Sequence, residues 1–236
     1  MFSLGKKSLI GSSLLQGAVD NHSHLLPAVD DGVRRIETTL EILEWLEGLG
    51  LKELWCTPHI MEDVPNESDT LKMRFEKLQE SYKGKIELHL AAEYMLDNLY
   101  LQRLNARDLL FHGEGKVLVE TSTVLPVGNV FELIFRTLSA GYTPIFAHPE
   151  RYLYMEPQQY ESLVSQGVVL QLNLPSILGF YGKDVARRAA WLLEKGYYSI
   201  SGSDCHRFQR IQEQYSAKVL DKKTIERLRP LMGELL

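Results

Sequence analysis

The sequence is poor in cysteine, with only Cys56 and Cys205 among 236 residues. Two cysteines can form at most one bridge, so a disulfide framework of the kind that holds small secreted domains together is excluded. Both cysteines lie in strand-like or site-adjacent stretches, which favours buried, reduced thiols. This pattern is typical of a protein in a reducing compartment.

The sequence also lacks long apolar runs and an excess of positive charge. Its longest apolar runs are far shorter than the roughly 20 residues that span a membrane. Residues 1–17 carry Lys6 and Lys7, but Gly11, Ser12 and Ser13 interrupt the apolar part, so we interpret them as an N-terminal arm of a cytoplasmic protein and not as a signal peptide. The net charge of -5 argues against broad nucleic-acid binding, which needs clustered Lys and Arg. This net charge is still compatible with a small phosphorylated substrate held by local positive charges.

Strand-like and helix-like segments alternate along the whole chain. Short aliphatic and β-branched runs predict seven strands, at 17–20, 51–57, 85–92, 116–120, 143–147, 167–173 and 197–201. Between them, apolar residues at helical spacing predict amphipathic helices near 37–49, 71–78, 97–104, 131–138, 160–164 and 185–193. Seven βα units with right-handed crossovers close most naturally into a distorted (β/α)7 TIM-like barrel in a single α/β domain, with a doubly wound open sheet as the alternative.

Six apolar stretches end in residues that can bind a metal ion, and five of the seven histidines lie in them. The loops that follow the strands of a barrel or an open α/β sheet converge on one face, so we expect these side chains to form one site. The candidate ligands are His22, His24, His59, Glu93, Glu120, His148, Asp204 and His206.

The spacing and types of these residues favour catalytic metal ions. His22 and His24 are two apart, so on an extended chain both imidazoles point to the same side and can reach one metal. The same alternation directs Asp204 and His206 into the site and leaves Cys205 behind it as a small buried hydrophobe. Imidazole and carboxylate ligands without thiolate suit Mn, Fe or Zn. Closely spaced cations bridged by carboxylates can clamp both oxygens of a phosphoryl transfer, so the sequence predicts a hydrolase with several metal ions.

Three further residues need an interpretation, and for two of them, Arg151 and His89, two remain open. The planar guanidinium of Arg151, three positions after His148, can bind phosphate oxygens, or it can form a salt bridge with Glu150. His89 is expected to be a hydrogen-bonded interior histidine, although its strand parity also allows a ligand. His112, close to Gly113 and Gly115, is expected in a surface loop.

The motifs, in this order, resemble the PHP (polymerase and histidinol phosphatase) superfamily, and specifically its bacterial protein-tyrosine phosphatase branch from capsular and exopolysaccharide loci. The resemblance covers about residues 18–210, so we expect residues 18–236 to form the phosphatase barrel and residues 1–17 to stay outside it. The motifs that carry it are Asp20 to Pro27, Asp30 to Gly32, Thr57 to His59, His148 to Tyr152, Asn173 to Ser176, Gly179 to Gly182 and Ser203 to His206.

This resemblance implies a distorted (β/α)7 barrel with three divalent metal ions, manganese being expected and Fe, Zn and Mg being alternatives. It adds Asp31 to the ligands, a residue that its neighbours alone would place in a turn. The implied sets are His22, His24, Glu93 and Asp204 for one metal, Glu93 as a bridge with Glu120 and His148 for the second, and Asp31, His59 and His206 for the third. It also implies that Arg151 binds phosphate, with Arg207 and Arg210 as candidates for a second arginine.

The function implied is a metal-dependent phosphatase for phosphotyrosine proteins, with the tail of a bacterial tyrosine autokinase as the expected substrate. Thiolate tyrosine phosphatases place an arginine six positions after their cysteine, but Ile211 and Glu62 occupy those positions here. Histidinol-phosphate or another small phosphomonoester is the alternative substrate. A nuclease is disfavoured because the chain has no basic and aromatic track, and a non-catalytic metal-bound regulator is disfavoured because every site position carries a competent ligand.

Overall fold

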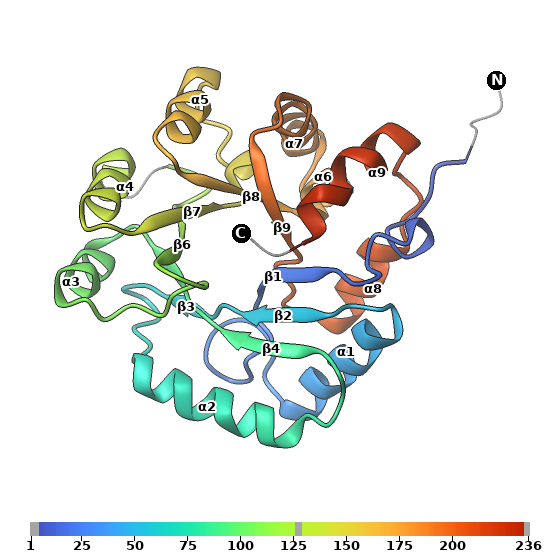
Figure 1. Cartoon of the computed structure of the whole chain (residues 1–236), viewed down its shortest axis with the longest axis horizontal. Coiled ribbons are helices and arrows are strands. Elements are labelled where there is room, and N and C mark those ends of the chain that lie inside the picture. Colours follow the sequence, from blue (N-terminus) through green and yellow to red (C-terminus); the bar gives the residue numbers. More distant parts are fainter. Residues whose placement is uncertain (1–4, 126–128, 234–236) are drawn as a thin grey trace.

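Parallel strands line the centre of the protein and helices cover them from outside in the computed structural model, which describes residues 5–125 and 129–233 (Figure 1). Three strands form one sheet in the order β1-β2-β4, namely β1 (Val19–Ser23), β2 (Glu53–Cys56) and β4 (Glu87–Leu90). Six strands form the other in the order β3-β5-β6-β7-β8-β9, namely β3 (His59–Ile60), β5 (Glu93–Met95), β6 (Lys116–Glu120), β7 (Thr143–Ala147), β8 (Val169–Asn173) and β9 (Tyr198–Gly202).

These nine strands correspond to the seven that the sequence predicts, because two of the seven are each interrupted by two residues. The register between β2 and β4 pairs Glu53 with Glu87, and the register between β3 and β5 pairs His59 with Glu93. Both pairs keep the same offset along the chain, so β3 continues β2 and β5 continues β4. The prediction of seven parallel strands is confirmed, with the first at Val19–Ser23 instead of 17–20.

The first and last strands meet at their C-terminal ends. The backbone N–H of Asp204 donates to His22 O at 2.8 Å, and that of His24 donates to Cys205 O at 3.0 Å. Ser23 and Cys205 form an isolated parallel bridge at the same place. This short seam, in place of a full ladder between β9 and β1, gives the barrel the distortion that the sequence predicts.

The helices on the outside include all six that the sequence predicts. They are α1 (Ile36–Gly48), α2 (Ser68–Ser81), α3 (Asn98–Ala106), α4 (Val130–Ser139), α5 (Pro157–Ser165) and α7 (Lys183–Lys195). In α7, Val185, Ala189 and Leu192 are buried on one stripe, and Gly196 ends the helix in the left-handed conformation that glycine adopts easily. The structure adds elements that the sequence patterns do not predict: α6 (Leu174–Ile177), α8 (Phe208–Ser216), α9 (Lys222–Leu228) and the 3-10 turns η1 (Ile10–Ser12), η2 (Pro149–Arg151) and η3 (Arg229–Met232).

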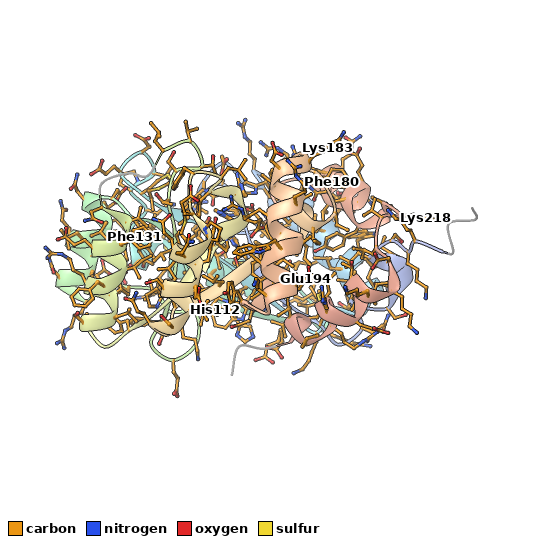
Figure 2. The ribbon with its side chains drawn as sticks, turned by 90° about the horizontal axis from the view of Figure 1, so that it is seen from above. His112, Phe131, Phe180, Lys183, Glu194 and Lys218 are labelled. Atoms are coloured by element: carbon orange, nitrogen blue, oxygen red, sulfur yellow. The ribbon has the colours of Figure 1, made fainter. Side chains whose placement is uncertain are left out.

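His112 lies at the end of the barrel opposite Phe180 and Lys183 (Figure 2). Its ring stacks on Trp55 with centroids 3.9 Å apart, and its Nε2–H donates to Asn21 O at 3.0 Å. His89 stacks on Trp55 as well, at 4.6 Å. His112 is buried, and burial lowers its pKa to about 3. The prediction of a surface loop for His112 is therefore wrong, because the loop turns its ring inwards to fill the space beside Trp55.

The segment before β1 packs against the barrel. Leu9, Leu14 and Leu15 are buried in the main core, and Lys7 forms an antiparallel bridge with Leu220. The arm predicted from the sequence is thus held by apolar contacts over residues 5–17. Among the described residues, no helix has the length and apolar character needed to cross a membrane.

Candidate metal centre

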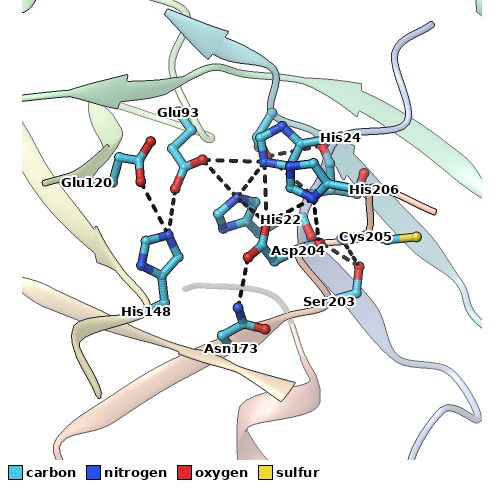
Figure 3. Close-up of polar contacts among 12 residues, drawn as sticks. His22, His24, Glu93, Glu120, His148, Asn173, Ser203, Asp204, Cys205 and His206 are labelled. Carbon is cyan, nitrogen blue, oxygen red and sulfur yellow. Dashed lines mark hydrogen bonds and ion pairs between the residues drawn. The ribbon is translucent and has the colours of Figure 1, made fainter. Parts of the chain in front are cut away.

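All nine predicted metal ligands lie together near the C-terminal ends of the strands, and Figure 3 labels seven of them, all except Asp31 and His59. Three groups have ligand atoms close enough to share an ion. They are His24, Asp31, His59 and His206; His22, His24 and Glu93; and His59, Glu93 and Glu120. His148 and Asp204 adjoin these groups through the ion pairs described below. The expected convergence of strand ends therefore brings the whole predicted set to one face.

Glu93 lies in the middle of the site and is fully buried. Its Oε2 atom is 3.2 Å from His22 Nε2, 3.3 Å from His24 Nε2 and 3.1 Å from His59 Nδ1. Its Oε1 atom is 3.0 Å from His148 Nε2. One carboxylate thus faces four imidazoles, which is the geometry that a bridging ligand requires.

The donor set fits metal ions better than it fits hydrogen bonds alone. The Nε2 atoms of His22 and His24 lie 3.1 Å apart, and each can present a lone pair to a metal ion. Glu93 Oε2 and His59 Nδ1 are buried and have no well-aligned hydrogen bond among the described residues. Buried polar atoms are normally paired, and cations among these nitrogen and oxygen atoms would supply the missing partners.

The pKa values of two imidazoles in the site are raised, so the site favours positive charge. Burial alone would lower the pKa of His22, but Glu93 and Asp204 outweigh it and raise the pKa to about 9. Burial likewise opposes the charge on His59, where Glu120 and Glu93 raise the pKa to about 12. Imidazole must lose its proton to bind a metal ion, so metal ions would compete with protons here.

The two aspartates in the loop after β1 contact different partners. Asp31 Oδ1 lies 3.3 Å from His206 Nε2 and 3.6 Å from His59 Nε2, and its contact with His206 lowers the pKa of Asp31. Asp30 instead accepts from His24 Nδ1–H at 2.8 Å and from the Gly32 backbone. Gly32 is required because a Cβ there would lie 2.3 Å from His24 O.

Two of the predicted ligands have backbone conformations that non-glycine residues rarely adopt. His148 has a φ of 37° and Asp204 a φ of 51°, both in the left-handed region. Such conformations cost about 1–3 kcal/mol each and persist where surrounding contacts impose them. The Tyr152 hydroxyl lies 3.1 Å from His148 Nδ1, which helps to hold that ring.

Asp204 connects the imidazoles to Arg151. Its Oδ1 lies 3.5 Å from His24 Nε2, and its Oδ2 accepts from Asn173 Nδ2 at 2.8 Å and from Arg151 Nη1 at 3.3 Å. The Arg151 guanidinium also lies over the Tyr181 ring, 4.6 Å from its centroid. Arg151 is therefore fixed at the edge of the metal centre.

Glu150 is not the partner of Arg151, so that alternative is wrong. Its Oε1 accepts from the Asn173 backbone N–H at 3.0 Å, and its Oε2 accepts from the Tyr198 hydroxyl at 2.8 Å. Glu150 is fully buried, and burial raises its pKa. The side chain thus ties η2 to β8 and β9, away from the metal centre.

A cavity of about 240 Å³ opens beside the centre, and its lining includes Asp31, Tyr181, Asp204, His206, Arg207 and Arg210. The two arginines differ in their contacts. Arg207 Nη1 donates to Gly32 O at 3.0 Å and so holds the loop that carries Asp31. Arg210 is exposed on α8 and lines the cavity. Arg210 is therefore better placed than Arg207 to meet a ligand in the cavity.

The two cysteines are buried, and Cys205 points away from the metal centre (Figure 3). Burial raises the pKa of both thiols, so they stay protonated near neutral pH. A protonated, enclosed thiol is a poor nucleophile. The prediction that Cys205 is a small buried residue is confirmed.

Four residues that support the ligands escape assignment from the sequence: Asp30, Tyr152, Gln171 and Asn173. Asp30, Tyr152 and Asn173 stand in motifs that carry the family resemblance, but those motifs did not indicate what the three side chains contact. Gln171 lies inside a strand with no signal except a polar residue among leucines.

The chain matches the model of a family described as capsular polysaccharide synthesis, CpsB/CapC, over residues 18–228. It is 28% identical over 214 residues to the tyrosine-protein phosphatase YwqE of Bacillus subtilis, covering 87% of this chain and 84% of that protein. It is 27% identical over 207 residues to the tyrosine-protein phosphatase CpsB of Streptococcus agalactiae serotype V, covering 80% and 82%.

The fold is similar to a crystal structure from a study of YwqE from Bacillus subtilis and CpsB from Streptococcus pneumoniae, described there as metal-dependent tyrosine phosphatases. The TM-score is 0.68 at 23% identity, and the match covers 92% of this chain and 96% of the other. The likeness extends over almost the whole barrel and confirms the predicted fold class.

Proposed function

Because this chain belongs to the CpsB/CapC family of capsular polysaccharide synthesis proteins, we propose that it is a metal-dependent protein-tyrosine phosphatase. Its relatives YwqE and CpsB are named tyrosine-protein phosphatases. The observation that carries the proposal is the buried Glu93 carboxylate, which faces four imidazoles within 3.3 Å beside the guanidinium of Arg151. Such a ligand set would hold metal cations, and hydrolysis of a phosphate monoester needs cations around the transferring phosphoryl group.

The centre is proposed to bind three divalent ions, with manganese favoured over Fe, Zn and Mg. His22, His24, Glu93 and Asp204 would hold one ion; Glu93, Glu120 and His148 the second; and Asp31, His59 and His206 the third. The proximity of His59 to Glu93 and Glu120 makes it a candidate to contact the second ion as well. When bound, such ions neutralise phosphate oxygens and lower the pKa of water, so that hydroxide is available near neutral pH.

Side chains around the centre are placed to hold the phosphate. Arg151 would bind a phosphate oxygen, since its planar fork matches phosphate geometry. Arg210 lines the cavity beside the centre and would supply a second positive charge there, whereas Arg207 keeps the Asp31 loop in place. Tyr181 forms an aromatic wall of the cavity, which suits an aromatic leaving group.

The proposed substrate is a phosphotyrosine protein, specifically the tail of a bacterial tyrosine autokinase that acts in capsule or exopolysaccharide synthesis. The enzyme is proposed to work in the cytoplasm, where such a tail would be accessible. Cysteine chemistry has no place in this reaction, because both thiols are enclosed and protonated.

Turnover of a phosphotyrosine peptide, measured beside histidinol phosphate, tests this function. With Mn²⁺ added, we expect efficient release of phosphate from the peptide, and a chelator should abolish it. Cys205→Ser is expected to keep most of the activity. Preference for histidinol phosphate would favour the alternative of a small-molecule phosphatase, and full activity in metal-depleted protein would refute the mechanism.

A further inference from the structure

Strand β8 differs from its neighbours in the barrel because none of the predicted metal ligands lies on it or directly after it. It carries two amide side chains instead, Gln171 and Asn173, which are 1% and 2% exposed. The two residues are two apart on the strand, so both point to the same side of the sheet. Each amide lies within hydrogen-bond distance of a predicted ligand that belongs to a different strand.

The contacts of Gln171 determine the orientation of its amide. One end lies 3.3 Å from the backbone carbonyl oxygen of Asn21, and the other lies 2.7 Å from His22 Nδ1. A carbonyl oxygen only accepts hydrogen bonds, so the NH2 group of Gln171 must face Asn21. The amide oxygen therefore faces His22 Nδ1.

This orientation fixes the state of His22. Because an amide oxygen only accepts, Nδ1 must carry a hydrogen that it donates to Gln171. In the neutral ring, Nε2 then has the free lone pair. Nε2 is the atom that lies 3.2 Å from Glu93 Oε2 and 3.1 Å from His24 Nε2, in the middle of the metal centre. Gln171 thus selects the tautomer that presents its lone pair to a metal ion.

The contacts of Asn173 determine the orientation of Asp204 in a similar way. An ionised carboxylate only accepts, so the NH2 group of Asn173 faces Asp204 Oδ2, at 2.8 Å. The other oxygen, Oδ1, is left toward the imidazoles and lies 3.7 Å from His22 Nε2 and 3.5 Å from His24 Nε2. Asn173 therefore helps to determine which oxygen of Asp204 faces the metal centre and which faces Arg151.

We propose that β8 is a positioning strand, in which Gln171 orients His22 and Asn173 orients Asp204 for metal binding. This inference rests on the proposed function in one respect, that His22 and Asp204 are metal ligands. Groups that orient ligands in this way typically contribute 10- to 100-fold to metal affinity.

Affinity for Mn²⁺, measured by competition with a chelating dye on the full chain and without substrate, tests the proposal. Gln171→Met keeps the length of the side chain but offers only a weakly accepting sulfur to Nδ1–H, so we expect binding about 10- to 100-fold weaker. Asn173→Leu should weaken binding through Asp204. The melting temperature in chelator shows whether each variant is folded, and the visible spectrum of the Co²⁺-loaded protein should change because the ligand geometry changes.

Gln171→Glu provides the rescue. A carboxylate accepts from Nδ1–H at least as well as an amide, and the Asn21 carbonyl keeps the hydrogen bond from His112 Nε2 at 3.0 Å. We therefore expect Gln171→Glu to bind Mn²⁺ within a few-fold of the parent. Thr137→Val is the matched control, because it removes a buried hydrogen bond with Tyr100 outside the metal centre, and its affinity should equal that of the parent.

Two results would overturn the proposal. One is a folded Gln171→Met variant with the Mn²⁺ affinity and Co²⁺ spectrum of the parent. The other is a Gln171→Glu variant that loses as much affinity as Gln171→Met, since the loss would then follow from packing. Failure of the proposed function would be distinguishable, because a parent protein that binds Mn²⁺ tightly but does not hydrolyse phosphotyrosine would refute the substrate and not the role of β8.

Discussion

Arg151 illustrates, at the scale of a single residue, how the metal centre is extended toward a substrate. Its guanidinium is fixed by Asp204 and by the Tyr181 ring, so little side-chain entropy remains to be lost when an anion binds. Arg151→Ala should lower kcat/KM for a phosphotyrosine peptide by about 10²- to 10³-fold, in line with the loss of one anion-stabilising donor. Arg151→Lys should recover only part, because an ammonium cannot make two parallel hydrogen bonds.

Metal content, measured by elemental analysis, should stay unchanged in Arg151→Ala. Arg136→Ala is a suitable control, since that arginine pairs with Glu132 on the exposed side of α4. An Arg151→Ala enzyme with the rate of the parent would show that the phosphate is held elsewhere, and Arg210 would then be the first residue to test.

Glu93 gives a second prediction at the residue scale. Glu93→Gln keeps the size of the side chain but removes the charge that faces four imidazoles. We expect the number of bound metal ions to fall and activity to drop by about 10- to 100-fold or more. Elemental analysis after gel filtration measures the first effect and peptide turnover the second. A variant with the full metal complement and rate would contradict the bridging role.

Among the elements, strands were predictable and their interruptions were not. The apolar runs fixed the order and approximate bounds of all seven strands, because a strand buried on both faces must be apolar. The same runs could not reveal that 51–57 and 85–92 lead into short second strands, since a bend leaves no periodic pattern. Similarly, α8 and α9 have apolar residues too few in number to stand out before their packing against the barrel is known.

The loop that carries His112 was predicted from the sequence, but the burial of its side chain was not. Glycines nearby suggested a loop, which is correct, but the direction of the side chain depends on the barrel interior that it fills. The neutral ring is required there, because burial lowers the pKa of His112 to about 3 while the unfolded chain keeps about 6.5. The stability that this ring contributes is therefore fully present above pH 6.5 and is lost as the pH falls toward 3.

This difference predicts a specific pH dependence of folding. Each pH unit below 6.5 costs about 1.4 kcal/mol from this one group, so at pH 5 the free energy of unfolding should be lower by about 2 kcal/mol. His112→Gln can still donate to the Asn21 carbonyl but does not titrate. Urea unfolding in chelator should show the parent losing about 2 kcal/mol more than the variant between pH 7 and pH 5. Equal losses would show that His112 does not control this range.

For the whole molecule, the candidate ligands were easier to identify from the sequence than the residues that contact them. A ligand at the end of a strand is visible because it interrupts an apolar run with a histidine or carboxylate, as in His59 or Glu120. A supporting residue such as Gln171 contacts a ligand 149 positions away along the chain. Only the closure of the barrel brings them together, and no local pattern encodes that distance. Asp31 was predicted as a ligand only from the family resemblance, because its neighbours in the sequence indicate a turn.

The short seam between β1 and β9 makes the integrity of the barrel depend on what the centre binds. Its two backbone hydrogen bonds use the amides of His24 and Asp204, both of which are proposed ligands. Bound cations would tie His22 and His24 of β1 to Asp204 after β9, and so would add to the few contacts that hold this join. Removal of metal should therefore separate β1 from β9 before the rest of the barrel unfolds, because local unfolding starts where few contacts hold the structure together.

Hydrogen–deuterium exchange can detect this opening. Peptides that contain His24 and Asp204 should exchange faster in chelator, whereas the amides of the β6 and β7 pair, which share a regular ladder, should stay protected. Uniform acceleration along the chain, or none, would contradict the idea. If the ring does open there, loss of metal would do more than stop catalysis: it would expose the unpaired edges of β1 and β9, which invite association with other chains. Availability of the cation would then govern how long the protein survives as well as how fast it works.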